Sequence, residues 1–261
     1  MVKEYLKRIY AMLIYLFLYA PILILIVFSF NASKSRGVWS GFTLHWYSEL
    51  LKDRQILSAL YNTILIAVLS ALIATLIGTA AAIGIHNMKK LKKKVIMNLT
   101  YLPVVSPDIV TGLSLMILFV FVKLQLGFLS LLLAHITFNI PYVILSVLPK
   151  LKQLDKHLYE AALDLGATPL EAYRKVILPE IMPGVVTGML LAFTLSLDDF
   201  VISFFTTGSG VSTLSITVYS MARRGINPKI NAISTILFVT VLLLLIIVNI
   251  RMSGNHNKKE R

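Results

Sequence analysis

The chain has 261 residues, of which 57% are hydrophobic and only 14% are charged, and its mean hydropathy is +0.81. A soluble domain of this size cannot bury so large an apolar fraction, so the composition predicts one membrane domain over residues 1–261. A net charge of +13 in a soluble protein would suggest nucleic acid as a partner, but here the basic residues cluster between hydrophobic stretches. The absence of cysteine excludes disulfides, thiolate catalysis and cysteine-based metal sites.

Hydrophobic stretches of about 20 residues recur along the chain and predict an all-α membrane protein with about six transmembrane helices. The first stretch follows a short basic segment and is too long for a cleaved signal peptide, so we expect an uncleaved first helix. The core helices are expected between about residues 59 and 250. The six predicted spans are residues 9–30, 59–85, 95–122 (interrupted by Pro103 and Pro107), 128–148, 183–206 and 230–250.

Basic residues are concentrated on one side of this topology. With six spans, the N-terminus, the run 89–94 of mostly lysines, the segment 155–179 and the basic tail all fall on the same side. The positive-inside rule therefore places both termini in the cytoplasm.

The segment 155–179 is too polar to span a membrane and is expected to form two short helices with a sharp bend, which we call the elbow. Gly166 suits the left-handed residue that ends the first helix. Thr168 and Glu171 have the spacing of a capping box at the start of the second helix, and we expect Pro179 to end it.

Small residues in the elbow would let another protein approach its backbone closely. The motif consists of Glu160, Ala161, Ala162, Gly166, Val176, Leu178 and Pro179. It resembles the cytoplasmic "EAA" loop of type I, binding-protein-dependent ABC importer permeases, with a valine at position 176 where isoleucine is usual. The resemblance implies that the elbow docks into a groove of an ATPase subunit. The alternative is a helical hairpin that only covers the cytoplasmic surface.

Three carboxylates fall within predicted spans: Asp108, Asp198 and Asp199. A carboxylate at bilayer depth costs at least about 2.5 kcal/mol, so such residues face a protein interior or an aqueous path. The spans offer no basic side chain to neutralise them, which makes a cation from outside their natural partner. Asp108 would also suit a helix start after Ser106 and Pro107, and one of the other two would also suit interfacial water.

Asp198 and Asp199 are expected on one helix, pointing about 100° apart, so that only one faces a narrow path. We expect that one to be Asp198, partly on family resemblance. Trp46 and Tyr219 lie in predicted outer segments, where an amine over an aromatic face gains about 0.5–2 kcal/mol. Interfacial anchoring is the alternative for both. His135 stands alone in an apolar span and is expected to be packed or hydrogen-bonded.

Among ABC permeases, the sequence is most similar to those of spermidine and putrescine importers. The resemblance rests on Trp46-Tyr47, on the segment 106–112 and on the segment 196–200. It implies polyamine import across a bacterial inner membrane, with a pair of ATP-binding subunits, a second homologous permease and an extracytoplasmic polyamine-binding protein.

Motifs of ATP hydrolysis and of common hydrolases are missing. The chain has no G-x-x-x-x-G-K-[ST], H-E-x-x-H or G-x-S-x-G sequence, so we expect no catalytic residues, no metal and no cofactor. One alternative is an ABC permease for another small solute, such as an amino acid, a metal or an anion. Others are a stand-alone proton-coupled transporter and a structural membrane scaffold.

Overall fold

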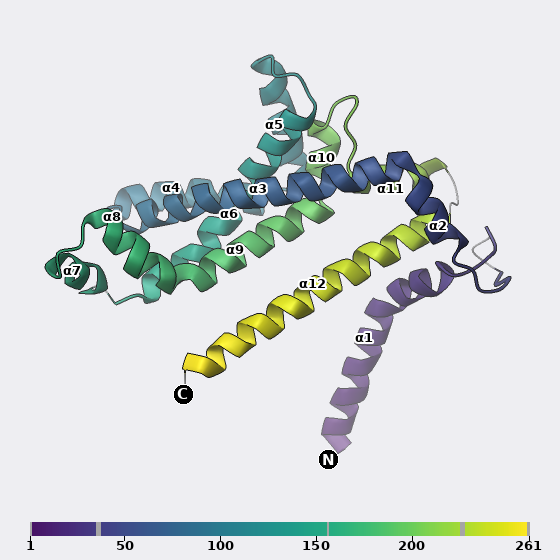
Figure 1. The fold of residues 1–261 in the computed structure, drawn as a ribbon, viewed down its shortest axis with the longest axis horizontal. Coiled ribbons are helices and arrows are strands. Elements are labelled where there is room, and N and C mark those ends of the chain that lie inside the picture. The colour runs from purple at the N-terminus through teal and green to yellow at the C-terminus, as the bar shows by residue number, and fades with distance from the viewer. Residues whose placement is uncertain (1, 35–37, 156, 225–227, 260–261) are drawn as a thin grey trace. The chain divides into compact units, whose positions relative to one another are not determined.

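The computed structural model describes residues 2–34, 38–155, 157–224 and 228–259, which form helices and a β-bridge between Asn31 and Phe42 (Figure 1). The all-α prediction is therefore confirmed. The chain divides into two compact units. Unit 1 comprises Met1–Leu57 with Val218–Arg261, and unit 2 comprises Ser58–Thr217.

Among the described residues of unit 1, the main helices are two long ones and a short one. They are α1 (Val2–Phe28), α2 (His45–Lys52) and α12 (Lys229–Lys259), and α12 contacts both of the others. Lys229 joins α12 to the α2 region, because its Nζ lies 3.3 Å from Glu49 Oε2 and 3.3 Å from Asp53 Oδ2.

Unit 2 holds most of α3, part of α11 and every helix between them. The elements are α3 (Arg54–His86), α4 (Lys90–Val105), α5 (Asp108–Phe121), α6 (Phe128–Gln153), α7 (His157–Asp164), α8 (Pro169–Ala172), the π-helical turn η1 (Tyr173–Ile177), α9 (Leu178–Asp198), α10 (Val201–Thr206) and α11 (Leu214–Arg224). Helices α6 and α9 lie side by side over much of their length (Figure 1).

Glycines allow the helices of unit 2 to approach closely. A Cβ built on Gly188 of α9 would lie 3.1 Å from Val143 Cα of α6, and one on Gly184 would lie 2.9 Å from the Ser146 carbonyl oxygen. A Cβ on Gly78 of α3 would lie 2.7 Å from Val143 Cβ. Close approach of backbones stabilises the association of helices in lipid, so these three glycines allow α3, α6 and α9 to pack into one core.

Four described helices are long and apolar enough to cross a membrane: Glu4–Phe28, Arg54–His86, Phe128–Gln153 and Pro169–Asp198. A fifth span results if α4 and α5 count as one, but they meet at a bend of 107°. The sixth predicted span lies in α12, whose apolar stretch is described for Lys229–Leu243. The count of six and the cytoplasmic termini stay predictions.

Two predicted spans are not continuous helices. The third, 95–122, breaks because Ser106 and Pro107 both adopt extended backbone with ψ of 143° and 139°. The fifth, 183–206, breaks after Asp198, where Asp199 has a ψ of 127°. The interruption of the third span was expected at Pro103 and Pro107; it lies at Pro107, whereas Pro103 stays inside α4. For the fifth span the expectation of one helix was wrong, because hydrophobicity alone does not report a local change of backbone direction.

Candidate functional site

Two exposed carboxylates of unit 2 lie near the contact between α5 and α10. Asp108 begins α5 and Asp198 ends α9, and both side chains are exposed. Gly112, about 6 Å along the helix axis from Asp108, packs on α10, since a Cβ there would lie 3.3 Å from Ile202 Cα and 3.4 Å from the Val201 carbonyl oxygen. Val201 follows Asp198 by three residues, so each carboxylate lies within four residues of this contact along the chain.

Asp199 has a different environment from its neighbour. Its side chain is only 7% exposed. Its carboxylate accepts hydrogen bonds from Ile202 N at 3.1 Å and from Ser203 N at 2.7 Å, in the first turn of α10. A carboxylate at this end of a helix satisfies free backbone donors and complements the helix dipole. The two aspartates are thus not neighbours on one helix, and the predicted 100° relation between them is corrected.

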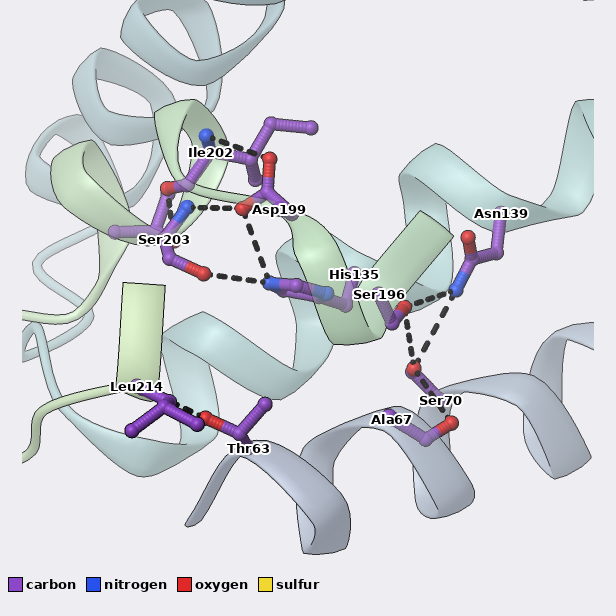
Figure 2. A network of polar contacts seen from close by, with 11 residues as sticks. Thr63, Ala67, Ser70, His135, Asn139, Ser196, Asp199, Ile202, Ser203 and Leu214 are labelled. Carbon is purple, nitrogen blue, oxygen red and sulfur yellow. Dashed lines mark hydrogen bonds and ion pairs between the residues drawn. The ribbon is translucent and has the colours of Figure 1, made fainter. Parts of the chain in front are cut away.

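His135 of α6 reaches the same break between α9 and α10 (Figure 2). Its Nε2 lies 3.1 Å from Ser203 Oγ and 3.6 Å from Asp199 Oδ2, and the side chain is 1% exposed. This confirms the prediction of a packed, hydrogen-bonded histidine. Both contacts fall on Nε2 while Nδ1 has no partner. A Ser–His–Asp relay needs opposite ring nitrogens, so this is no nucleophilic site.

A second buried polar cluster links three helices of unit 2. The Asn139 amide of α6 donates to Ser196 Oγ of α9 at 2.7 Å and to Ser70 Oγ of α3 at 3.3 Å, and the two hydroxyls lie 3.0 Å apart (Figure 2). Sequence reasoning missed this cluster. The signal was present, because His135 and Asn139 are polar residues four apart in an apolar helix and therefore share one face.

The elbow has the predicted bend and cap. Gly166 has a φ of +85°, in the left-handed region. Thr168 Oγ1 accepts a hydrogen bond from Glu171 N at 3.4 Å, and Glu171 Oε2 accepts one from Thr168 N at 3.1 Å, which forms the capping box. Hydrogen bonds from the Lys175 ammonium and from Thr168 lower the pKa of Glu171 to about 2. The bend is thus held by local backbone geometry and charge.

Pro179 does not end the second elbow helix, contrary to expectation. Helix α8 continues through η1 into α9, and Pro179 stands in the first turn of α9. In η1 the hydrogen bonds span five residues, as in the bond from Leu178 N to the Tyr173 carbonyl oxygen. This wider turn accommodates the proline, which has no N–H to donate. A helix therefore runs without interruption from Pro169 to Asp198.

The elbow is hydrogen-bonded to the end of α3 and shares an apolar cluster with the end of α6. The Tyr159 and Tyr173 rings lie 5.0 Å apart, and Asn87 Nδ2 donates to the Tyr173 hydroxyl at 2.8 Å. Ala162 is buried, whereas the predicted coupling residues Glu160, Ala161, Gly166 and Pro179 are exposed and Leu178 is half-buried. The outward-facing members of the motif are available for contact with another protein.

The two predicted aromatic residues belong to unit 1. The Trp46 indole is 5% exposed, and its Nε1 donates to the Asn31 carbonyl oxygen at 2.7 Å. Tyr219 of α11 is 46% exposed. Asp108 and Asp198 both belong to unit 2, whereas Trp46 has a packed, hydrogen-bonded position in unit 1.

The helical fold, the break between two acidic residues and the projecting elbow define a membrane permease. Residues 74–256 match the family model of the binding-protein-dependent transport system inner membrane component, and the chain belongs to this family. It is an inner-membrane protein, and as a permease it is the membrane channel subunit of a transporter rather than a catalytic subunit.

Among the most similar relatives are permease proteins of spermidine and putrescine transport systems. The chain is 44% identical to the spermidine/putrescine transport system permease protein PotC of Escherichia coli K12, over 89% of this chain and 88% of that protein. It is 43% identical to the putrescine transport system permease protein PotI of the same organism, over 86% and 83%. Its fold is similar to that of a bacterial ABC transporter involved in the import of alginate, with a TM-score of 0.72, 18% identity and coverage of 97% and 98%.

Proposed function

We propose that this chain is the transmembrane permease subunit of an ATP-driven importer of polyamines such as spermidine and putrescine. The observation that carries the proposal is the pair of exposed carboxylates, Asp108 and Asp198, near the α5–α10 contact. Among the ion pairs of the described residues, neither carboxylate takes part in one. An unneutralised carboxylate at membrane depth is costly unless a cation or water serves it, and a polyamine carries several cations.

The continuous helix from the elbow to Asp198 supports a coupling mechanism. It runs from Pro169 to Asp198, 30 residues, so a movement of the elbow is transmitted along one rod to the acidic end of α9. At the usual helical rise the rod is about 45 Å long. ATP binding would close a pair of ATP-binding subunits that hold the exposed elbow, and the rod would then shift against a second, homologous permease.

Coupling of this kind is reciprocal in its binding free energies. An extracytoplasmic polyamine-binding protein that prefers one state of the permease must promote that state at the elbow as well. Family members are binding-protein-dependent, which agrees with this partner. Trp46 and Tyr219 are proposed to contribute to the outer part of the path, with Trp46 acting through the packing of unit 1.

Uptake of labelled spermidine by the complete complex in liposomes tests the proposal. Asp108→Asn and Asp198→Asn should each raise KM by about tenfold, because each loses one charge-assisted contact of roughly 1.5 kcal/mol. Glu180→Gln, which removes an exposed carboxylate from the other end of α9, is the matched control and should leave KM unchanged. Normal KM in both aspartate variants would refute the cationic path.

The other functions make different predictions in the same assay. A permease for an amino acid, a metal or an anion would show uptake of that solute and no competition by spermidine. A stand-alone proton-coupled transporter would work without ATP and without partner subunits. We expect the chain alone in liposomes to transport nothing.

A further inference from the structure

We propose that His135 is a positioning residue for Asp198. It holds the break between α9 and α10 from the side of α6 and thereby fixes where the Asp198 carboxylate is presented to a cationic solute. The inference rests on the proposed function of Asp198. His135 lies 63 positions before Asp198 in the chain and is proposed to act on the solute only through Asp198.

The geometry of the break carries this inference. Asp198 is the last residue of α9, and Asp199, the next residue, bonds two backbone N–H groups of α10. The carboxylate of Asp199 and the hydroxyl of Ser203 both contact His135 Nε2, at 3.6 Å and 3.1 Å. Asp199, which follows Asp198, thus contacts both α10 and α6. These contacts restrict the peptide bond between the two aspartates and with it the direction of the Asp198 side chain.

The hydrogen-bond chemistry defines what position 135 must supply. Nε2 lies within hydrogen-bonding distance of Ser203 Oγ, at 3.1 Å, and Asp199 Oδ2 lies further away, at 3.6 Å. A hydrogen atom on Nε2 would face both oxygens. Nδ1 has no hydrogen-bond partner and is buried. We therefore assign position 135 a donor nitrogen at the place of Nε2. The amide nitrogen of a glutamine reaches the place of Nε2, whereas that of an asparagine reaches only the place of Nδ1.

The experiment compares His135→Gln with His135→Asn in the complete complex in liposomes, with KM and maximal rate for spermidine as readouts. His135→Asn should raise KM about three- to tenfold, as expected for one buried hydrogen bond. His135→Gln should stay within about twofold of the unmodified chain, because it keeps the donor. Ser203→Ala removes the partner on α10 and should raise KM in the same direction.

A double-mutant cycle separates positioning from general destabilisation. In the Asp198→Asn background, His135→Asn should change KM by less than about twofold, because the carboxylate that it positions is already gone. The matched control is Thr63→Val, which removes a buried hydrogen bond of 2.8 Å that Leu214 N donates to Thr63 Oγ1 elsewhere in unit 2. It should lower the melting temperature of the complex and leave KM unchanged.

Several results would overturn the inference. An equal rise in KM from His135→Asn in the unmodified chain and in the Asp198→Asn background would show that His135 acts independently of Asp198. A rise of the same size from Thr63→Val would show that loss of any buried hydrogen bond in unit 2 has this effect on KM. A rise for Asp198→Asn without any rise for His135→Asn and Ser203→Ala would refute the positioning role alone. No effect of Asp198→Asn would instead refute the proposed role of Asp198, and the inference with it. If the His135→Asn chain does not assemble into the complex, Ser203→Ala takes its place in the double-mutant cycle with Asp198→Asn.

Discussion

Gly166 offers a sharp test of the elbow, because its backbone and its surroundings impose separate demands. Its φ of +85° lies in the left-handed region, and a Cβ built there meets no atom of this chain within 4 Å. Within the chain, Gly166→Ala therefore has only a backbone cost, which is about 1–2 kcal/mol. Gly166→Asn should cost less, since asparagine tolerates this region. Gly166→Leu adds a bulky side chain that only a partner protein would touch.

The measurement is the affinity of the purified ATP-binding subunit for the permease in detergent, together with spermidine uptake in liposomes. We expect the affinity to fall about 5- to 30-fold for Gly166→Ala, and less for Gly166→Asn. Gly166→Leu should abolish docking and uptake while the chain stays in the membrane. Normal docking and uptake by Gly166→Leu would refute the coupling role of the elbow. Weaker docking of the asparagine variant than of the alanine variant would show that side-chain size, not backbone conformation, is what matters.

Three further substitutions test the packing that positions these sites, each by thermal unfolding of the purified complex. Gly188→Val should destabilise it by about 1–3 kcal/mol, because the new side chain would push α9 away from Val143 of α6; an unchanged melting temperature would contradict the close α6–α9 contact. Trp46→Phe should cost about 1 kcal/mol through the lost indole bond to Asn31, and Trp46→Leu must then cost more. Thr168→Ala should cost about 1 kcal/mol by removing the helix cap, whereas Thr168→Ser should be close to neutral.

The elbow shows what could be predicted from local sequence. A glycine that ends a helix and a threonine three residues before a glutamate act through neighbours in the chain, so their spacing alone specifies the left-handed turn and the capping box. Pro179 shows the limit of such reasoning, because a π-helical turn absorbs a proline that normally ends a helix. In the structure η1 also contacts α7, a contact that the spacing of residues along the chain does not report.

By itself, the sequence determined the helical membrane class, the apolar stretches and the elbow, because composition, hydrophobic length and cap spacing are all read along the chain. Only the tertiary structure decided that Asp198 is exposed while the side chain of Asp199 is 7% exposed, and that His135 reaches the break after Asp198. The contact between His135 and Ser203 joins residues 68 positions apart. Hydrophobic periodicity carries no information about such a pairing, since it arises from the way α6, α9 and α10 pack in space.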